Sequence, residues 1–141
     1  MKRKQTDPVL GVTHGSLRTM LKSALRPIWR RTSRKKFIES VRRHDINPKT
    51  GRQWFVVDCV DCGRVMGCSE KERRPLAKGG LSKKERSVFE VDHIDGITPL
   101  GDIKETLGPH VHDLLYGKQE IVCYKCHAKR TANQAKERHG K

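Results

Sequence analysis

Two Cys-x-x-Cys pairs constrain the fold of this 141-residue chain more than any other feature. The first pair is Cys59 and Cys62, and the second is Cys123 and Cys126. Four thiolates in two such turns match the tetrahedral ligand set of a structural zinc ion, whose binding supplies folding free energy. A redox disulfide is the competing interpretation, but two well-separated pairs fit it poorly. A shared zinc ion would close the chain between the pairs into one compact unit.

The composition indicates why this chain would need a metal ion to stabilise its fold. The chain is 34% hydrophobic and 5% aromatic, so its core is modest. The fifth cysteine, Cys68, has no partner at short spacing, and we expect a bystander, with a substitute zinc ligand as the alternative. The start Met1-Lys2-Arg3-Lys4 leads into polar residues, and there is no long apolar run. We therefore expect a cytoplasmic protein with reduced cysteines and no membrane association.

The charge of the chain points to a polyanionic partner. The formal net charge is +15, and residues 1–54 carry fifteen Lys and Arg against three acidic residues. Residues 55–141 carry sixteen against thirteen, so the excess lies in the first third. Nucleic acid is the first candidate for such a basic segment. We expect a basic helical DNA-binding arm over residues 1–53 and a second domain over residues 54–141.

Helical spacing of apolar residues describes most of the arm. After a flexible lead over residues 1–15, the pattern predicts a helix over 16–26, ended or kinked by Pro27, and a second helix over 33–44. A solvated basic face is one interpretation of the cations on these helices. Contact with DNA phosphates is the one we favour. The cations concerned are Arg26, Arg30, Arg31, Arg34 and Lys35.

The second domain shows alternating strand and helix signals. A strand over 54–57 leads into the first cysteine pair, and residues 68–86 are expected to form an exposed loop. A strand that starts near Phe89 ends on Asp92 and His93. A helix that starts near Asp102 is expected to break at Gly108-Pro109. A short strand over 119–122 then delivers the second cysteine pair, and a helix over 125–138 follows.

The acid and the imidazole at the strand end suggest a catalytic site. A carboxylate is a hard oxygen ligand for a divalent cation, and an imidazole acts as a base near neutral pH. His127 follows Cys126 directly, so the zinc-closed unit would bring it towards Asp92. Asp92 and His127 could then share one ion while His93 activates water for phosphodiester hydrolysis. The alternative is that His127 caps the zinc site or lies on the surface.

These residues together resemble a known motif. The runs Val91-Asp92-His93-Ile94 and Cys123-Tyr124-Lys125-Cys126-His127 are similar to the HNH endonuclease motif, in the zinc-stapled, four-cysteine form of the His-Me finger superfamily. The resemblance covers roughly residues 55–135. It implies an α+β chain with a ββα-metal finger that nicks or cleaves DNA.

The resemblance also implies a role for each matching residue. His93 matches the general base, and Asp92 and His127 match the ligands of a single catalytic ion, commonly magnesium or manganese. The four paired cysteines match the ligands of the structural zinc. The lead around Leu25–Arg30 is similar to that of small phage-encoded HNH proteins, which implies the host bacterial cytoplasm and leaves a phage protein partner open. A homodimer is neither required nor excluded.

One position departs from the family pattern. The middle Asn usually lies about five residues before the third zinc cysteine, where this chain has Lys118, and a lysine cannot coordinate the ion. His110, His112 and Asp113 precede that position, and of these we prefer His112 as the replacement. Plain surface positions on a polar helix are the alternative for all three.

The final helix adds cations beside His127. We expect Lys125, Lys129 and Arg130 to contact phosphates, with a solvated face as the alternative for Lys129. Tyr124 is the only aromatic residue near these positions in the sequence, so stacking on single-stranded bases is not indicated. Double-stranded DNA is therefore the preferred substrate.

Two rival functions are compatible with the same features. One is a non-catalytic zinc module that binds nucleic acid, as a regulator or a packaging accessory. The other is an RNA-directed or ribosome-associated protein, which a high positive charge also allows.

Overall fold

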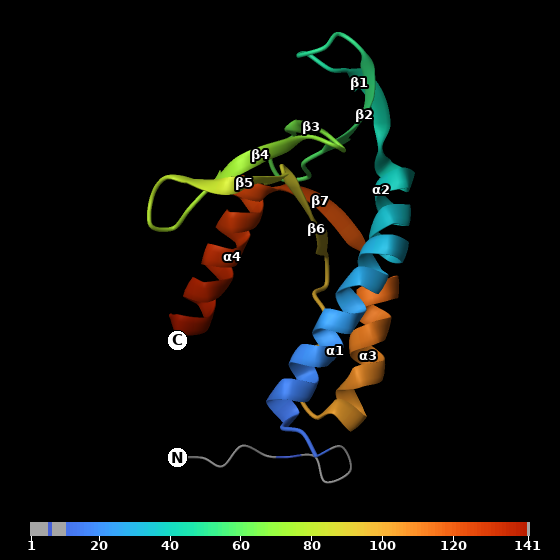
Figure 1. The fold of residues 1–141 in the computed structure, drawn as a ribbon, viewed down its shortest axis with the longest axis vertical. Helices are drawn as coiled ribbons and strands as arrows, with labels where there is room; N and C mark the ends of the chain where they lie inside the picture. Colours follow the sequence, from blue (N-terminus) through green and yellow to red (C-terminus); the bar gives the residue numbers. More distant parts are fainter. Residues whose placement is uncertain (1–5, 7–10, 141) are drawn as a thin grey trace. The chain divides into compact units, whose positions relative to one another are not determined.

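A computed structural model describes residue 6 and residues 11–140 of the chain (Figure 1). The expected lead over residues 1–15 therefore lies largely outside the described residues. The described chain is α+β, as expected, with helices and several small sheets. Close packing divides it into two compact units, each made of two separate stretches. The first combines the chain up to Lys36 with His93–Lys118, and the second combines Phe37–Asp92 with Gln119–Lys141.

This division differs from the expected order of an arm up to residue 53 followed by one domain. Residues 93–118, which lie late in the sequence, are grouped with the N-terminal helix. The reason is that helix α3 (Ile103–Tyr116) packs on α1 (His14–Trp29) and on the π-helical turn η1 (Arg30–Arg34). The second unit is thereby interrupted in sequence between Asp92 and Gln119.

The second unit holds most of the buried side chains. Strands β1 (Arg43–Ile46), β2 (Gln53–Asp58) and β3 (Val65–Gly67) form one antiparallel sheet in the order β1-β2-β3. Val56 and Val57 of β2 are buried with Met66 of β3, as the apolar strand over 54–57 predicts. Gly67 is required because a Cβ there would lie 2.4 Å from the Trp54 ring.

A second sheet of this unit carries the candidate motif. Strands β6 (Phe89–His93) and β7 (Gln119–Cys123) pair with each other, and helix α4 (Tyr124–His139) follows β7 directly. Val88 and Phe89 at the start of β6 are buried, as are the central residues of β7. The backbone joins this sheet to the first cysteine turn, since the Val60 N–H donates to the Ile121 carbonyl at 3.0 Å.

The first unit is helical and has few buried residues. Among its described residues, the buried side chains are those of Leu100 and His110. Thr13 caps α1 by accepting from the Ser16 N–H, and Asp102 caps α3 by accepting from the Lys104 N–H. The two ends of the segment that contains α3 lie side by side, because the Ile94 N–H donates to the Lys118 carbonyl at 2.9 Å.

Four expected element boundaries differ from the structure. Residues 68–86 are not a loop: they contain strands β4 (Lys71–Pro75) and β5 (Leu81–Ser87), an antiparallel hairpin. Helix α3 continues through Gly108-Pro109 instead of breaking there. The expected helix over 33–44 is α2 (Lys35–Val41), which follows α1 and η1 without a gap and gives way to β1. Pro27 lies inside α1, so it does not end that helix.

Candidate functional site

The four paired cysteines lie close together, as their spacing predicts. The sulfur atoms of Cys59, Cys62, Cys123 and Cys126 all lie within 4.8 Å of one another. Those of Cys62 and Cys123 are 3.8 Å apart. Four sulfurs that bind one zinc at about 2.3 Å in a tetrahedron lie about 3.8 Å from each other. The arrangement is compatible with a structural zinc ion.

The backbone positions these sulfurs through two tight turns. Cys59 follows β2 directly, and the turn that it starts closes with a hydrogen bond from the Gly63 N–H to the Cys59 carbonyl at 2.9 Å. Gly63 has a φ of +74°, which favours glycine. Cys123 is the N-cap of α4, and its sulfur accepts from the Cys126 N–H at 3.4 Å. Each pair therefore presents two sulfurs from one turn.

The thiols of the cluster shift one another's pKa values in opposite directions. Burial alone would raise the pKa of Cys59, but hydrogen bonds from the backbone around the cluster bring that pKa to about 7. A hydrogen bond with Cys123, together with burial, raises the pKa of Cys126 to about 12. Four crowded thiols cannot all ionise without a counter-charge, which a divalent ion provides. Cys68 lies outside the cluster, as expected for a bystander, and burial raises its pKa.

Asp92 and His127 meet within the second unit. The His127 Nδ1 atom lies 3.0 Å from Asp92 Oδ1 and 3.1 Å from Asp92 Oδ2. The Asp92 side chain is 20% exposed and that of His127 is 42% exposed, so both are accessible from solvent. Asp92 lies on β6 and His127 in the first turn of α4, next to Cys126 of the cysteine cluster. The cysteine cluster and this pair therefore share one short segment of helix.

Arg130 has a role that the sequence did not indicate. One turn beyond His127, its guanidinium donates two hydrogen bonds to Asp61, at 2.7 and 2.6 Å, and another to Glu120. It also lies 3.6 Å from Asp92 Oδ2. These hydrogen bonds lower the pKa of Asp61 and raise that of Arg130. Arg130 thus connects the first cysteine turn to the Asp92–His127 pair, while Lys125 and Lys129 remain exposed.

His93 belongs to the other compact unit and is held by its backbone. The His93 Nε2 atom lies 2.8 Å from the Leu114 carbonyl oxygen of α3. A carbonyl only accepts hydrogen bonds, so Nε2 carries the proton of the neutral ring and Nδ1 keeps a lone pair. The His93 ring also lies 5.7 Å from the Trp29 ring and against Gly117, where a Cβ would be 3.3 Å from His93 Cδ2.

The residues that could replace the middle Asn have other contacts. His110 is buried, and its Nδ1 lies 2.7 Å from the Thr98 carbonyl. Asp113 accepts hydrogen bonds from the Thr98 backbone N–H and hydroxyl, and these lower its pKa. His112, which we preferred, is 72% exposed, and its ring lies 5.5 Å from the Tyr116 ring. The contact that holds His93 comes from the Leu114 carbonyl, which no side-chain pattern could reveal.

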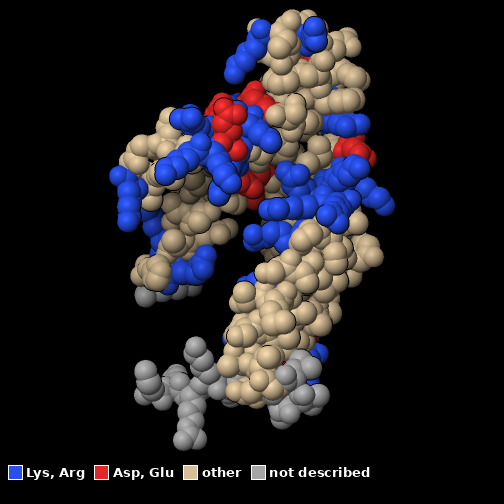
Figure 2. Space-filling view, in the orientation of Figure 1, with Lys and Arg blue, Asp and Glu red and all other residues tan. Residues whose placement is uncertain are grey.

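The helical part of the first unit presents many cations. Residues 26–36 contain six Lys and Arg and no acidic residue. Figure 2 shows Lys and Arg side chains gathered over the upper part of α1 and the start of α2. A hollow on α1 is lined by Thr19, Lys22, Ser23, Arg26, Pro27 and Arg30. Of the expected DNA-binding residues here, Arg26, Arg30, Arg31 and Lys35 are exposed and Arg34 is half-buried.

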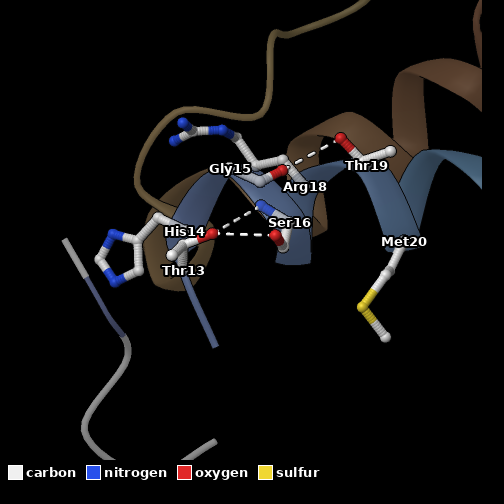
Figure 3. A pocket seen from close by; sticks show the side chains of 7 residues that line it. All are labelled: Thr13, His14, Gly15, Ser16, Arg18, Thr19 and Met20. Atoms are coloured by element: carbon white, nitrogen blue, oxygen red, sulfur yellow. Dashed lines mark hydrogen bonds between the residues drawn. The ribbon is translucent and has the colours of Figure 1, made fainter. Parts of the chain in front are cut away.

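A second hollow lies at the start of the same helix. Figure 3 shows its lining residues, Thr13, His14, Gly15, Ser16, Arg18, Thr19 and Met20. The Ser16 N–H donates to Thr13 Oγ1 at 3.2 Å, and the Thr19 hydroxyl donates to the Gly15 carbonyl at 3.0 Å. These polar groups are satisfied by hydrogen bonds within α1 and its N-cap.

Comparisons with protein-family models, curated proteins and solved structures found no match to this chain. Within the described residues, every helix is too short or too polar to span a membrane.

Proposed function

We propose that this protein is a metal-dependent DNA endonuclease of the HNH type, with a ββα-metal finger closed by a four-cysteine structural zinc. The observation that carries the proposal is the Asp92–His127 contact beside the cysteine cluster. Strand β6, strand β7 and helix α4 supply these residues in the order that the motif requires. The exposed cations of α1, η1 and α4 supply charge for a duplex.

The donor atoms of Asp92 and His127 fit one catalytic ion. Adjacent ligands of an octahedral Mg²⁺ with bonds of about 2.1 Å lie about 3.0 Å apart. The observed Nδ1–Oδ1 distance is 3.0 Å. One imidazole and one carboxylate suit Mn²⁺ as well as Mg²⁺ and leave positions for water and phosphate oxygens. When bound, such an ion supplies charge stabilisation for the phosphate in the transition state.

The residues of the chain then have separate roles. Asp92 and His127 would hold the ion. His93 takes a proton from water at Nδ1, because the Leu114 carbonyl keeps the ring proton on Nε2. Arg130 holds the Asp92 carboxylate in place through its ion pair, and its own charge is balanced by Asp61 and Glu120. Lys125 and Lys129 remain available for the phosphates that flank the cut.

A non-catalytic zinc module that binds nucleic acid is the second candidate. The Asp92 carboxylate favours this candidate, because two residues of the chain itself, His127 and Arg130, already contact it. An internal pair of this kind needs no ion. The two candidates differ in one result, which is whether a phosphodiester bond is broken.

The test is a nicking assay on supercoiled plasmid with zinc-loaded protein, with and without Mg²⁺ or Mn²⁺. We expect relaxed or linear plasmid only with the added ion, and a loss of about 10²- to 10⁴-fold in rate for His93→Ala. His139→Ala is the matched control and retains the wild-type rate, because His139 is exposed in the last turn of α4, whereas His127 lies in its first turn. Intact plasmid under conditions in which the protein binds it would establish the binding module instead.

A further inference from the structure

The β4–β5 hairpin is a ribbon with an excess of positive charge. Residues 71–87 carry seven Lys and Arg and two Glu. The strands pair antiparallel, with Lys71 opposite Ser87 and Arg73 opposite Glu85, and the ladder shifts between Arg73 and Pro75. Figure 2, in the orientation of Figure 1, shows Lys and Arg side chains gathered over this hairpin.

One face of the ribbon is anchored to the second unit. Arg74 pairs with Glu90 at 2.6 Å and lies over the Tyr124 ring, 5.3 Å from its centroid. Glu72 pairs with Arg64 at 2.7 Å and accepts from the Tyr124 hydroxyl at 3.2 Å. Alternate residues of β4 are therefore half-buried and paired. This anchoring joins the base of the ribbon to the first residue of α4.

The remaining cations of the ribbon have no such partners. Six of them are exposed, and none forms an ion pair with any residue that the structure describes: Lys71, Arg73, Lys78, Lys83, Lys84 and Arg86. The contrast with Arg74 and Arg64 is informative, because carboxylates do lie nearby in this unit. The ribbon presents a surface whose charge is left uncompensated by the protein.

We propose that the β4–β5 hairpin is a second DNA-binding element, separate from the helical arm, that contacts the phosphates of duplex DNA. The major groove of B-DNA admits a two-stranded β-ribbon. Cations on an exposed ribbon reach phosphates on either side of the groove, and contacts of this kind position a protein without reading sequence. The inference takes its partner, duplex DNA, from the proposed function.

The composition of the ribbon favours a duplex over a single strand. Proteins that bind single strands stack bases on aromatic side chains. Residues 70–87 contain no Phe, Tyr or Trp. The ribbon therefore offers charge without a stacking surface, which suits a partner whose bases are already paired.

The experiment measures affinity for a short duplex by fluorescence anisotropy over a range of salt concentrations. It uses the full zinc-loaded chain without added Mg²⁺ or Mn²⁺, so cutting plays no part. The test variant is Lys83→Gln/Arg86→Gln. The control is Lys104→Gln/Lys118→Gln, which removes two exposed cations that lie outside the arm, the hairpin and α4. Zinc content and thermal unfolding confirm that both variants are folded.

We expect the test variant to bind roughly tenfold more weakly, with the slope of log affinity against log salt reduced by about 2. The control should change affinity less than twofold. Glu85→Gln should bind more tightly than wild type, because it removes the acidic residue opposite Arg73. Equal slopes for wild type and the test variant, or a preference for single-stranded RNA over the duplex, would overturn the proposal.

The outcome is independent of catalysis. A protein that binds duplex through the hairpin and leaves plasmid intact supports this inference and contradicts the proposed endonuclease. A protein that nicks plasmid while the hairpin variant binds as wild type contradicts only this inference.

Discussion

The two compact units of this chain are stabilised in different ways. The second has a β-sheet core, four clustered cysteines and a network of ion pairs around Arg130 and Arg74. The first relies on helix packing and on a few hydrogen bonds to backbone carbonyls, and among its described residues only Leu100 and His110 are buried. The proposed ion ligands belong to the former and the proposed base to the latter.

In the proposed site, the ion ligands are therefore held by more contacts than the general base is. Ion ligands must keep a fixed separation, and Asp92 and His127 lie beside the four clustered cysteines and the ion pairs of Arg130. A general base needs the correct tautomer, and one carbonyl, that of Leu114, is sufficient for that. The two units should therefore respond differently to the loss of zinc, of an ion pair and of helix packing.

The largest effect is expected from removal of zinc. Zinc-finger peptides gain about 10–16 kcal/mol from the metal, so chelation or Cys123→Ser should unfold the second unit. Hydrogen exchange should show loss of protection in β2 and β7, with a smaller loss in α1 and α3. A zinc-free chain with unchanged protection and unchanged thermal unfolding would show that the sheet core alone suffices.

A smaller effect is expected from Arg130→Lys. Lysine keeps the charge but cannot donate in parallel to Asp61 while also reaching Glu120. We expect nicking at saturating DNA to fall about 10- to 100-fold, with a rise in the Mn²⁺ concentration that gives half-maximal rate and unchanged DNA affinity. Lys136→Ala, an exposed position on the same helix, is the control. Weakened DNA binding with normal Mn²⁺ dependence would instead assign Arg130 to phosphate contact.

Gly117→Ala tests the helical unit. An added Cβ would lie 2.4 Å from the Asp113 carbonyl oxygen, so the backbone after α3 must shift. We expect the free energy of unfolding to fall by about 1–3 kcal/mol, measured by urea denaturation. Gly101→Ala is the control, because the nearest atom to a Cβ there is 4.0 Å away. Equal stability of the two variants would show that the end of α3 is not closely packed.

The smallest effect concerns Asp113. Hydrogen bonds from Thr98 lower the pKa of this carboxyl below its ordinary 3.8. The stabilisation is fully present above pH 3.8 and is lost as the pH falls through the lower native pKa. The difference in stability between wild type and Asp113→Asn should therefore be equal at pH 7 and pH 5 and shrink below pH 3.8. A difference that grows on acidification would contradict this assignment.

The sequence predicted the features that depend on local spacing. The cysteine cluster follows from two four-residue turns, and β2, β7 and α4 follow from apolar runs and helix-forming residues. The prediction failed for β4 and β5 because strands rich in Lys, Arg and Glu have low β propensity. Their hairpin is held by Arg74 and Tyr124, a contact between positions fifty residues apart.

The candidate site shows the same limit. Side-chain types identified Asp92 and His127, whose contact the structure shows, while His93 as base stays a prediction. His110, His112 and Asp113 are side-chain candidates for the position of the middle Asn, whereas the observed partner of His93 is the backbone carbonyl of Leu114. Arg130 was interpreted as a phosphate ligand because a sequence does not show which carboxylates will surround it.

The most direct test of this division of roles is to measure Mn²⁺ binding to the zinc-loaded protein by electron paramagnetic resonance. We expect one Mn²⁺ site in the wild type, its loss in Asp92→Asn and in His127→Ala, and its retention in His93→Ala. Wild-type protein that binds no Mn²⁺ in the presence of duplex DNA, or binding that survives both ligand substitutions, would contradict the account.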